Sequence, residues 1–457
     1  MKTLPIVLAV VPFFTCGAAE AAGQRPAADD QDCAAPQARF TAEELLKHAH
    51  PEAVHHAVPL PDDENAYPVW SEAGRKLNEI NGTDYPRWLL DHRNPNKPLP
   101  EGQQRQALYD RLERHKPVLE LVDRAAARQR FQLPPYSDDV NLGSSGALAK
   151  LKVDRARLRA GQGDWTGALA DLGDVIHVGR GLARGEGVLV YWAFGNAVHS
   201  EGLTAMQALA RNPRTPDEVV AKLRSMLPPP TDLCEEWATV LRVEFTSFFV
   251  PNLAAFYPSD EKLEEKLREL RREHPCSLDP ADAVRSASQQ VRDDIAACHL
   301  PWAGISDYVE ERGRAVSCTE RLFEVLQASA DCTTPEDPFV KGLVAATKNR
   351  HVRRVFINEA YWRATRVALS IESHRRRHGK FPRSLADLDW TDGDATTIDP
   401  FSGEAFRYDA SRGLLWSVGE NGEDDGGRSR WASDPDDATK ETRRADDIAW
   451  KLTPSSW

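Results

Sequence analysis

The sequence predicts a mainly α-helical protein, an irregular stack of helical hairpins that is followed by a small α+β lobe at the C-terminus. Three observations support this fold class. Apolar residues recur at three- and four-residue intervals through most of the chain, the period of a helix with one buried face. Proline and glycine clusters separate these stretches. The alternation of apolar and polar residues that marks a half-buried strand is nearly absent before residue 400.

The composition is that of an ordinary globular protein. The 457 residues suffice for a large core, and 41% of them are hydrophobic and 28% charged. The mean hydropathy of −0.52, without any apolar run near about 20 residues, excludes a polytopic membrane protein. Lys and Arg number 58 against 70 Asp and Glu, a net charge of −12, which argues against a nucleic-acid-binding protein.

Residues 1–21 have the order of an export signal. Lys2 gives a positive start, Leu4 to Phe14 form an apolar segment, and Ala19-Glu20-Ala21 fits the small-residue rule of signal peptidase. The apolar segment is too short to span a bilayer of about 30 Å. We therefore expect a cleaved signal peptide, a periplasmic or secreted bacterial protein, and no integral membrane span once the signal is removed.

Six cysteines remain after the predicted cleavage, in an oxidising compartment that permits disulfides. Five of them fall between residues 234 and 332, and we expect at least one bridge among these five, with the connectivity left open. They are Cys234, Cys276, Cys298, Cys318 and Cys332. Cys33 stands apart from them. Cys16, inside the signal, is an alternative site for a lipid anchor, but the residues before it differ from a lipobox.

Residues 22–60 are expected to form a flexible leader with a short helix, ahead of an all-helical domain over residues 61–347. Thr41 and Glu44 have the spacing of a capping box, which predicts the start of that helix. Proline and glycine clusters then separate a series of amphipathic stretches. These lie at 68–81, 101–130, 146–161, 165–184, 188–211, 216–226, 231–247, 260–273, 278–298, 302–329 and 337–379.

Residues 156–172 resemble one helical hairpin of a tetratricopeptide repeat. Gly163, Asp164, Trp165 and Ala168 match the turn between its two helices. No clear second copy follows at the period of about 34 residues, and a single hairpin cannot form a solenoid. An irregular stack of hairpins is therefore expected, and a peptide-binding groove on a helical repeat is the alternative.

Motifs that carry catalysis are missing from the sequence. It contains no nucleophile elbow of the GxSxG type and no glycine loop for phosphate binding. His374 and His378 share a helix face, but the residues between them are three arginines, which repel a divalent metal, instead of the glutamate of an HExxH site. Four more histidines form a cluster that lacks a carboxylate partner at fixed spacing. These are His48, His50, His55 and His56.

The last hundred residues have a different pattern from the body. A long helix over 351–379 is expected to end at Gly379, and a glycine-rich acidic loop, GENGEDDGG, follows the last apolar strand. From Asp389 to Trp450, acidic side chains are more than twice as numerous as basic ones. Between the helix and the loop we expect a short helix at Ser384–Leu388, strands at Ala405–Tyr408 and Leu414–Val418, and a hairpin loop at 409–413.

This order of elements resembles the globular domain of the major pseudopilins of type II secretion systems. The segments HGKFPRSLADL, DPFSGEAFRY, LLWSVGENGEDDGG and ADDIAW carry the resemblance, which assigns residues 348–457 to a pseudopilin-like lobe. In that family the loop after the last strand binds a calcium ion, together with an acidic residue near the C-terminus. The resemblance implies calcium as a cofactor and four ligands, Asn421, Asp424, Asp425 and Asp447.

Three features of the lobe differ from that family. Asn421 stands where the family has an aspartate, and the insert from Arg428 to Arg444 is longer than usual. The hydrophobic half of the pilin helix is missing, so this chain is not expected to assemble as a pilin.

The whole chain also resembles exported bacterial helical proteins of uncharacterised function that carry a P-x-x-E-N-A segment, here ending in Glu64-Asn65-Ala66, before a helical body and the same tail. We expect an exported, non-enzymatic helical scaffold or interaction protein with a calcium-binding lobe. Its partner is expected to be an envelope protein or peptide. The alternatives are a partner-binding helical-repeat module of the cell envelope and an enzyme without a recognisable motif.

Overall fold

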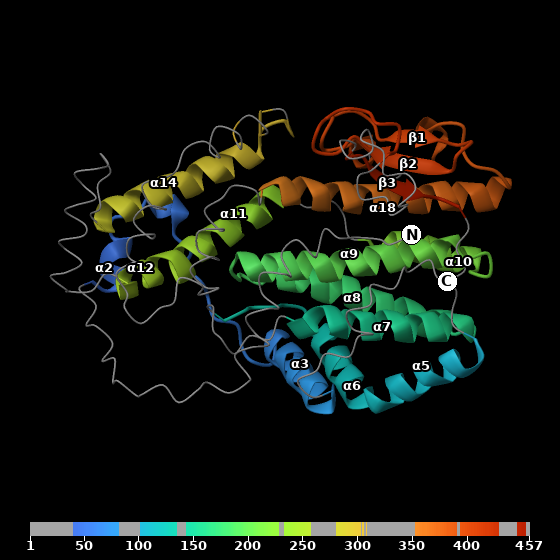
Figure 1. Ribbon diagram of the computed structural model, residues 1–457, viewed down its shortest axis with the longest axis horizontal. Coiled ribbons are helices and arrows are strands. Elements are labelled where there is room, and N and C mark those ends of the chain that lie inside the picture. The colour runs from blue at the N-terminus through green and yellow to red at the C-terminus, as the bar shows by residue number, and fades with distance from the viewer. Residues whose placement is uncertain are drawn as a thin grey trace, which may run out of the picture.

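The computed structural model describes residues 40–81, 101–134, 143–227, 233–256, 280–302, 304–305, 308, 352–390, 394–428 and 446–453. This part of the chain is mainly helical and has a small three-stranded antiparallel sheet near the C-terminus, which confirms the predicted fold class (Figure 1). The signal segment, the predicted helix at 260–273, most of that at 302–329, and five of the seven cysteines lie outside the described residues.

The described helices follow the predicted stretches closely. They are α2 (Ala42–Leu46), α3 (Tyr67–Asn81), α5 (Gly102–Arg114), α6 (Lys116–Ala126), α7 (Gly143–Gly161), α8 (Trp165–Arg184), α9 (Leu189–Arg211), α10 (Asp217–Met226), α11 (Leu233–Glu244), α12 (Val250–Phe256), α14 (Pro280–Cys298) and α18 (Val352–His378). The short 3₁₀ turns are Pro51–Ala53, Leu385–Asp387 and Asp394–Thr397, and Phe245–Phe249 is a π-helical turn.

Four long helices, α18, α9, α8 and α7, lie one below another, with α3, α5 and α6 beneath them (Figure 1). The α7–α8 pair is the hairpin predicted around residue 163. Gly163 has a φ of 82°, which a glycine adopts without strain, and the Asp164 carboxylate caps α8 by accepting the Gly167 N–H at 2.9 Å. Ala168 is fully buried in the contact between the helices.

Two predicted stretches differ from the observed elements. The stretch at 101–130 is two helices. The helix α5 ends at Arg114 and α6 begins at Lys116, with Pro117 in its first turn, where its missing N–H is harmless. The stretch at 231–247 continues past residue 247 as the π-helical turn and then α12.

The N-terminal part of the described chain is held against the body by side-chain hydrogen bonds. Thr41 and Glu44 form the predicted capping box. The Asn65 amide pins the P-x-x-E-N-A segment, since its Oδ1 accepts the Gln132 N–H at 2.9 Å and its Nδ2 donates to the Gln132 carbonyl at 2.9 Å. Gln132 in turn binds Leu60 through its side chain. This segment therefore has a structural role, because it holds the chain at Gln132, after the end of α6.

The C-terminal sheet has the order β1-β2-β3, with β1 at Arg407–Asp409, β2 at Leu414–Ser417 and β3 at Ile448–Lys451. The first strand starts two residues later than predicted, because Ala405 forms an isolated bridge with Ile398. The third strand was not predicted. It pairs antiparallel with β2 and so brings the chain back beside the acidic loop.

The helix α18 packs against both the body and the sheet. Trp362 and Leu369 join an apolar cluster with α7 to α10, whereas Val355, Ala364 and Ile371 join a second cluster that includes the sheet residues. A third cluster joins α2, α3 and α6 to α12 and α14. Because the sheet and the body share the core along α18, the domain boundary at residue 348 stays a prediction.

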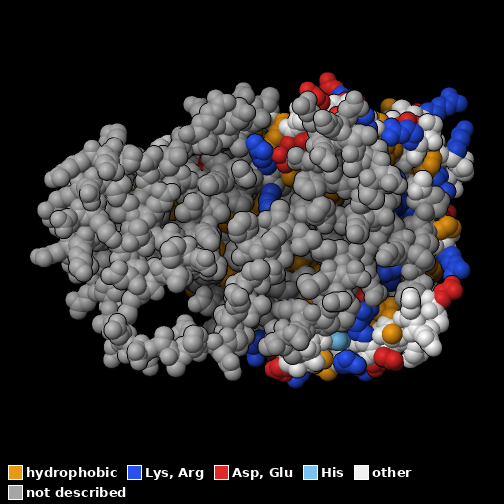
Figure 2. All heavy atoms as spheres, viewed as in Figure 1, with side chains coloured by type: hydrophobic (Ala, Val, Ile, Leu, Met, Phe, Trp, Pro, Cys, Tyr) orange, Lys and Arg blue, Asp and Glu red, His pale blue; other side chains and the backbone are white. Residues whose placement is uncertain are grey.

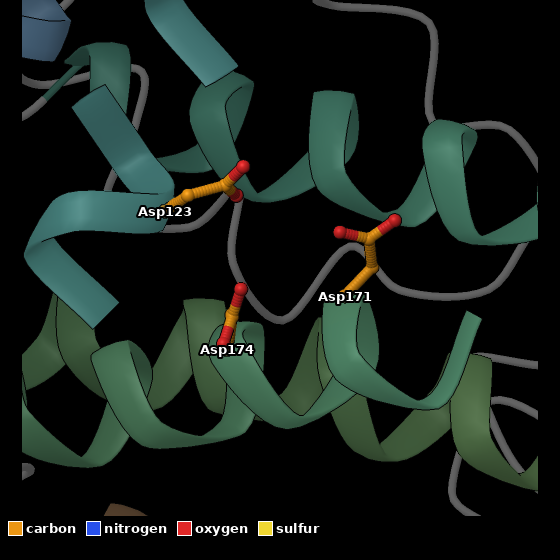
Figure 3. Close-up of side chains that lie close together, drawn as sticks. All are labelled: Asp123, Asp171 and Asp174. Carbon is orange, nitrogen blue, oxygen red and sulfur yellow. The ribbon is translucent and has the colours of Figure 1, made fainter. Parts of the chain in front are cut away.

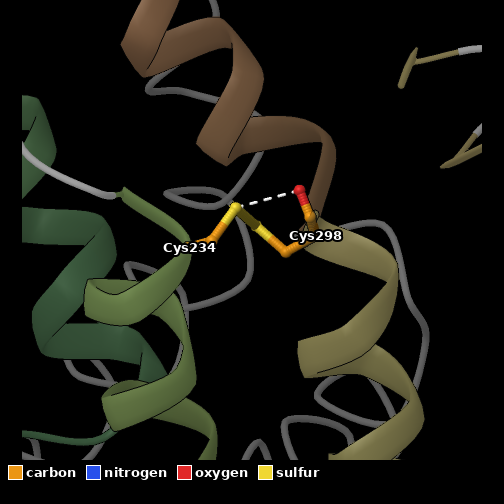
Figure 4. The surroundings of a disulfide bond; sticks show 2 residues. All are labelled: Cys234 and Cys298. Carbon is orange, nitrogen blue, oxygen red and sulfur yellow. Dashed lines mark hydrogen bonds between the residues drawn. A yellow bond between two sulfur atoms is a disulfide. The ribbon is translucent and has the colours of Figure 1, made fainter. Parts of the chain in front are cut away.

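A disulfide joins Cys234 at the start of α11 to Cys298 at the end of α14 (Figure 4). It confirms the prediction of a bridge among the five clustered cysteines. The Cys234 sulfur also contacts the Cys298 carbonyl oxygen at 2.9 Å, but an oxidised sulfur has no proton to donate. None of the helices in the described part of the chain combines the length and apolar composition that a membrane span requires.

Candidate metal site and charge clusters

The acidic loop of residues 419–427 starts from a fixed point at the end of β2. The buried Asp399 carboxylate accepts the Ser417 hydroxyl at 2.7 Å and the Val418 N–H at 3.0 Å. A Cβ atom on Gly419 would lie 2.2 Å from the Asp446 carbonyl oxygen, so only glycine permits this close approach to the returning chain. The sequence marked Asp399 only as part of a turn, and the structure gives it the role of positioning the loop.

The structure brings three of the four predicted ligands, Asn421, Asp425 and Asp447, to one place. The Asn421 Nδ2 donates to Asp425 Oδ2 at 3.1 Å. The fully buried Asp447 accepts the Gly427 N–H at 2.7 Å and the Asp425 N–H at 3.4 Å. Asp446 and Asp447 therefore lie beside the loop, although the long insert from Arg428 to Arg444 separates them from it in the sequence.

Asp446 lies in the same group, although the resemblance to pseudopilins did not imply it as a ligand. Its Oδ2 accepts the Asn421 N–H at 3.1 Å, and its own N–H donates to Asp425 Oδ2 at 3.3 Å. The signal in the sequence was the adjacent pair Asp446-Asp447.

Asp424 faces another direction. Its Oδ1 accepts the Trp416 indole N–H and the Gly426 N–H, both at 2.9 Å, and its Oδ2 lies 3.4 Å from the Arg407 guanidinium. Burial raises the pKa of Asp424, but these hydrogen bonds and the Arg407 charge outweigh burial and lower it. Asp424 thus ties the loop to β1 and β2.

Asp447 is electrostatically strained in its position. Burial raises its pKa to about 6, the charges of Asp425 and Asp424 add to this rise, and the two backbone hydrogen bonds oppose it. Several carboxylates gathered in a half-buried place repel one another unless a cation or a proton joins them. The donor set therefore fits a hard cation.

A second acidic group lies in the helical body, where no site was predicted from the sequence. Oxygens of Asp123 on α6 and of Asp171 and Asp174 on α8 lie within 4.8 Å of one another (Figure 3). No other set of His, Cys, Asp and Glu side chains in the described residues meets this criterion for three metal ligands.

The Lys152 ammonium on α7 occupies the centre of this aspartate group. Its Nζ lies 2.7 Å from Asp123, 2.6 Å from Asp171 and 2.5 Å from Asp174. Arg155 and Arg159 also bind Asp171, so three cations balance three carboxylates. An ammonium has three N–H donors, and all three are used here. The group is thus an internal ion network that joins α6, α7 and α8.

A third charged place lies where α9 begins. Glu244 accepts the Leu189 N–H at 2.7 Å, one of the donors that a helix N-terminus leaves without an internal partner. Burial raises the pKa of Glu244 to about 7, and this hydrogen bond opposes the rise. Nearby, the His55 Nε2 lies 3.6 Å from Glu186, whose φ of 55° is in the left-handed region.

We expect Glu244 to make stability depend on pH. The pKa in the folded chain lies above its usual 4.5, so the folded state holds the extra proton between pH 4.5 and 7. The free energy of unfolding therefore falls as the pH rises through this window. Glu244→Gln should reduce that fall by about 3 kcal/mol, measured by urea unfolding at pH 4.5 and pH 7.5. Equal pH dependence in both proteins would contradict this assignment.

The N-terminal histidines do not converge on one place. The His48 Nδ1 lies 3.4 Å from the Arg285 guanidinium, and the His50 Nδ1 lies 3.4 Å from that of Arg292, both on α14. The His55 ring faces Glu186 instead. They contact basic side chains and a single carboxylate, which does not make a metal site.

The described part of the surface in Figure 2 has basic, acidic and apolar side chains interspersed. Among the described large apolar residues, Val58 and Leu300 are the exposed ones. No known protein family, curated protein or solved structure matches this chain.

Proposed function

We propose that this chain is an exported, non-enzymatic helical scaffold or interaction protein, and that its pseudopilin-like C-terminal lobe binds one calcium ion. The observation that supports the ion is the return of Asp446 and Asp447 to the acidic loop. This return gathers oxygen donors from Asn421, Asp425 and Asp447, which are held by the Asn421 side-chain amide and by two backbone N–H groups.

The donor set suits calcium better than a softer metal. Calcium takes six to eight oxygen ligands at about 2.3–2.6 Å and tolerates irregular geometry, whereas magnesium requires a near-ideal octahedron. Each carboxylate oxygen that accepts one N–H keeps a second lone pair for the ion. Gly422 and Gly426 have φ values of 69° and 70°, which lets the loop curve around its own side chains.

The role of a scaffold is supported by the contacts between α18 and the helical body. The Arg376 guanidinium on α18 donates to the carbonyls of Ala210 and Asn212, at 2.8 Å and 2.7 Å, and the buried Gln207 amide donates to Thr365 at 2.6 Å. The body therefore holds one side of α18, and the sheet and the acidic loop lie on the opposite side of this helix (Figure 1). In this proposal the presented lobe meets an envelope protein or peptide.

Calcium is expected to raise the melting temperature of the full mature chain. An ion that binds only the folded state stabilises it by RT ln(1 + [L]/Kd), about 2.7 kcal/mol when calcium is at 100 times Kd. The full chain is the right sample because the sheet shares its core with the body. Thermal unfolding in EDTA and in millimolar calcium measures the shift.

The variant Asp425→Asn/Asp447→Asn should lose this shift. The matched control is Asp424→Asn, because Asp424 is bound to Trp416 and Arg407 and does not face the other donors. The control should keep most of the calcium shift. Identical melting curves of the wild type in EDTA and in calcium would overturn the proposed ion.

A further inference from the structure

Two histidines at the C-terminal end of α18 lie side by side outside the calcium loop. The rings of His374 and His378 have centroids 4.3 Å apart and planes inclined by 41°. Residues four apart on a helix share one face, and the helix fixes their relative position. His378 is exposed and His374 half-buried, so solvent reaches this pair of imidazoles without any rearrangement of the main chain.

The arginines between the two histidines have partners of their own. The Glu372 carboxylate binds Arg375 at 2.6 Å and Arg376 at 2.8 Å, and Arg376 turns toward the carbonyls of the body. Arg377 pairs with Asp389 at 2.9 Å. Each of the three arginines is therefore paired with a carboxylate, which offsets part of the positive charge that argued against a metal in the sequence.

The surroundings of His374 favour the neutral form of its imidazole. The groups that act on His374 are His378 and Arg377 from its own helix and Asp387 and Asp389 from the turn that follows. Slight burial, His378 and Arg377 lower the pKa of His374, and the two carboxylates oppose them. A neutral imidazole has the lone pair that a metal needs. The helix C-terminus adds partial negative charge.

We propose that His374 and His378 bind one divalent transition-metal cation of the class that prefers imidazole, such as Zn²⁺ or Cu²⁺. The two imidazoles are the protein ligands, and water completes the coordination. Imidazole nitrogen suits these borderline metals, whereas calcium selects oxygen. This site is therefore independent of the proposed calcium site and does not rest on it.

Zinc titration of the full mature chain tests the proposal. The protein carries no affinity tag, since added histidines would bind zinc, and it is kept in millimolar calcium so that the acidic loop is not a competing site. Isothermal calorimetry at pH 7.5 is expected to find one zinc ion in the tightest site. Lowering the pH below about 6.5 should weaken this binding, because protons compete for the imidazoles.

Variants of each histidine show whether the pair acts as a chelate. His374→Gln and His378→Gln should each weaken the tightest site by about tenfold or more, and the double variant, which keeps neither imidazole, should lose the site. The matched control is His299→Gln, which removes an exposed histidine after α14 and should leave the affinity unchanged. Circular dichroism confirms that each variant is folded.

Two results would overturn the proposal. One is wild-type zinc affinity in the double variant, which would place the tightest site elsewhere in the chain. The other is an equal loss for His299→Gln and for His374→Gln, which would mean that zinc binds exposed histidines without a chelate.

Discussion

Lys152→Met is expected to lower the free energy of unfolding by about 3–5 kcal/mol, because it removes one partner from a buried ion network. The Lys152 side chain is 1% exposed and binds Asp123, Asp171 and Asp174. Methionine has a similar length and fills the space, so the loss of charge dominates the effect. Asp174 is affected most, since burial and its acidic neighbours already raise its pKa and Lys152 opposes them.

Lys76→Met is a matched control for this prediction. It makes the same chemical change at an ion pair of similar length, 2.8 Å from Lys76 to Glu79, but these side chains are 45% and 58% exposed. An exposed pair contributes little to stability, because water and salt screen its charges. Urea unfolding of the two variants at pH 7 compares them directly. Equal losses would show that burial of the Lys152 network has no energetic consequence.

Part of the Lys152→Met loss should be recovered at low pH. Without the ammonium, the carboxylate of Asp174 is relieved by taking up a proton. The deficit relative to the wild type should therefore shrink between pH 7 and pH 5, whereas the small deficit of Lys76→Met should not.

The helical body was predictable because its information is local. The period of apolar residues, the Thr41 and Glu44 spacing and the Gly163–Asp164 turn each depend on residues a few positions apart. Burial then follows from the same period, as it does for Ala168 in the α7–α8 contact.

The third strand and the return of Asp447 to the loop depend on distant parts of the chain. Strand β3 has only four residues, Ile448–Lys451, too few for its alternation to stand out. Its partner, β2, ends before a long insert, and no spacing rule relates positions across such an insert. The register that places Asp447 against Gly427 is therefore visible only in the folded chain.

The charged residues of the Lys152 network form a visible pattern in the sequence, but the network itself was not predicted. Lys152, Arg155 and Arg159 recur at helical spacing, as Asp171 and Asp174 do, so each helix shows a charged stripe. A charged stripe usually faces solvent. Only the packing of α6, α7 and α8 shows that these two stripes face one another, which turns a surface pattern into a buried network.

Removal of the Cys234–Cys298 disulfide is expected to lower the free energy of unfolding by about 4 kcal/mol in the chain-entropy model. The bridge closes a loop with a sequence separation of 64. Cys298 is 2% exposed and joins an apolar cluster with Trp237 and Trp302, so the bridge lies within packed structure.

The bridge also holds a residue that contacts the acidic loop. Trp302 follows Cys298 closely, its ring packs against Phe401 at a centroid distance of 4.7 Å, and its indole N–H donates to the Glu420 carbonyl at 3.0 Å. Loss of the disulfide should therefore loosen both the α11–α14 contact and the start of the loop.

Cys234→Ala/Cys298→Ala tests this expectation with the chain otherwise unchanged. Guanidinium unfolding should give a free energy of unfolding about 4 kcal/mol lower for the variant than for the unreduced wild type. Reduction of the wild type with dithiothreitol should remove most of this difference. The double alanine variant leaves no unpaired thiol at this place, so reactivity does not confuse the comparison. Peptide mapping of the unreduced wild type should recover the Cys234 and Cys298 peptides joined. Two free thiols at these positions would contradict the bridge, and equal stability of variant and wild type would contradict its energetic role.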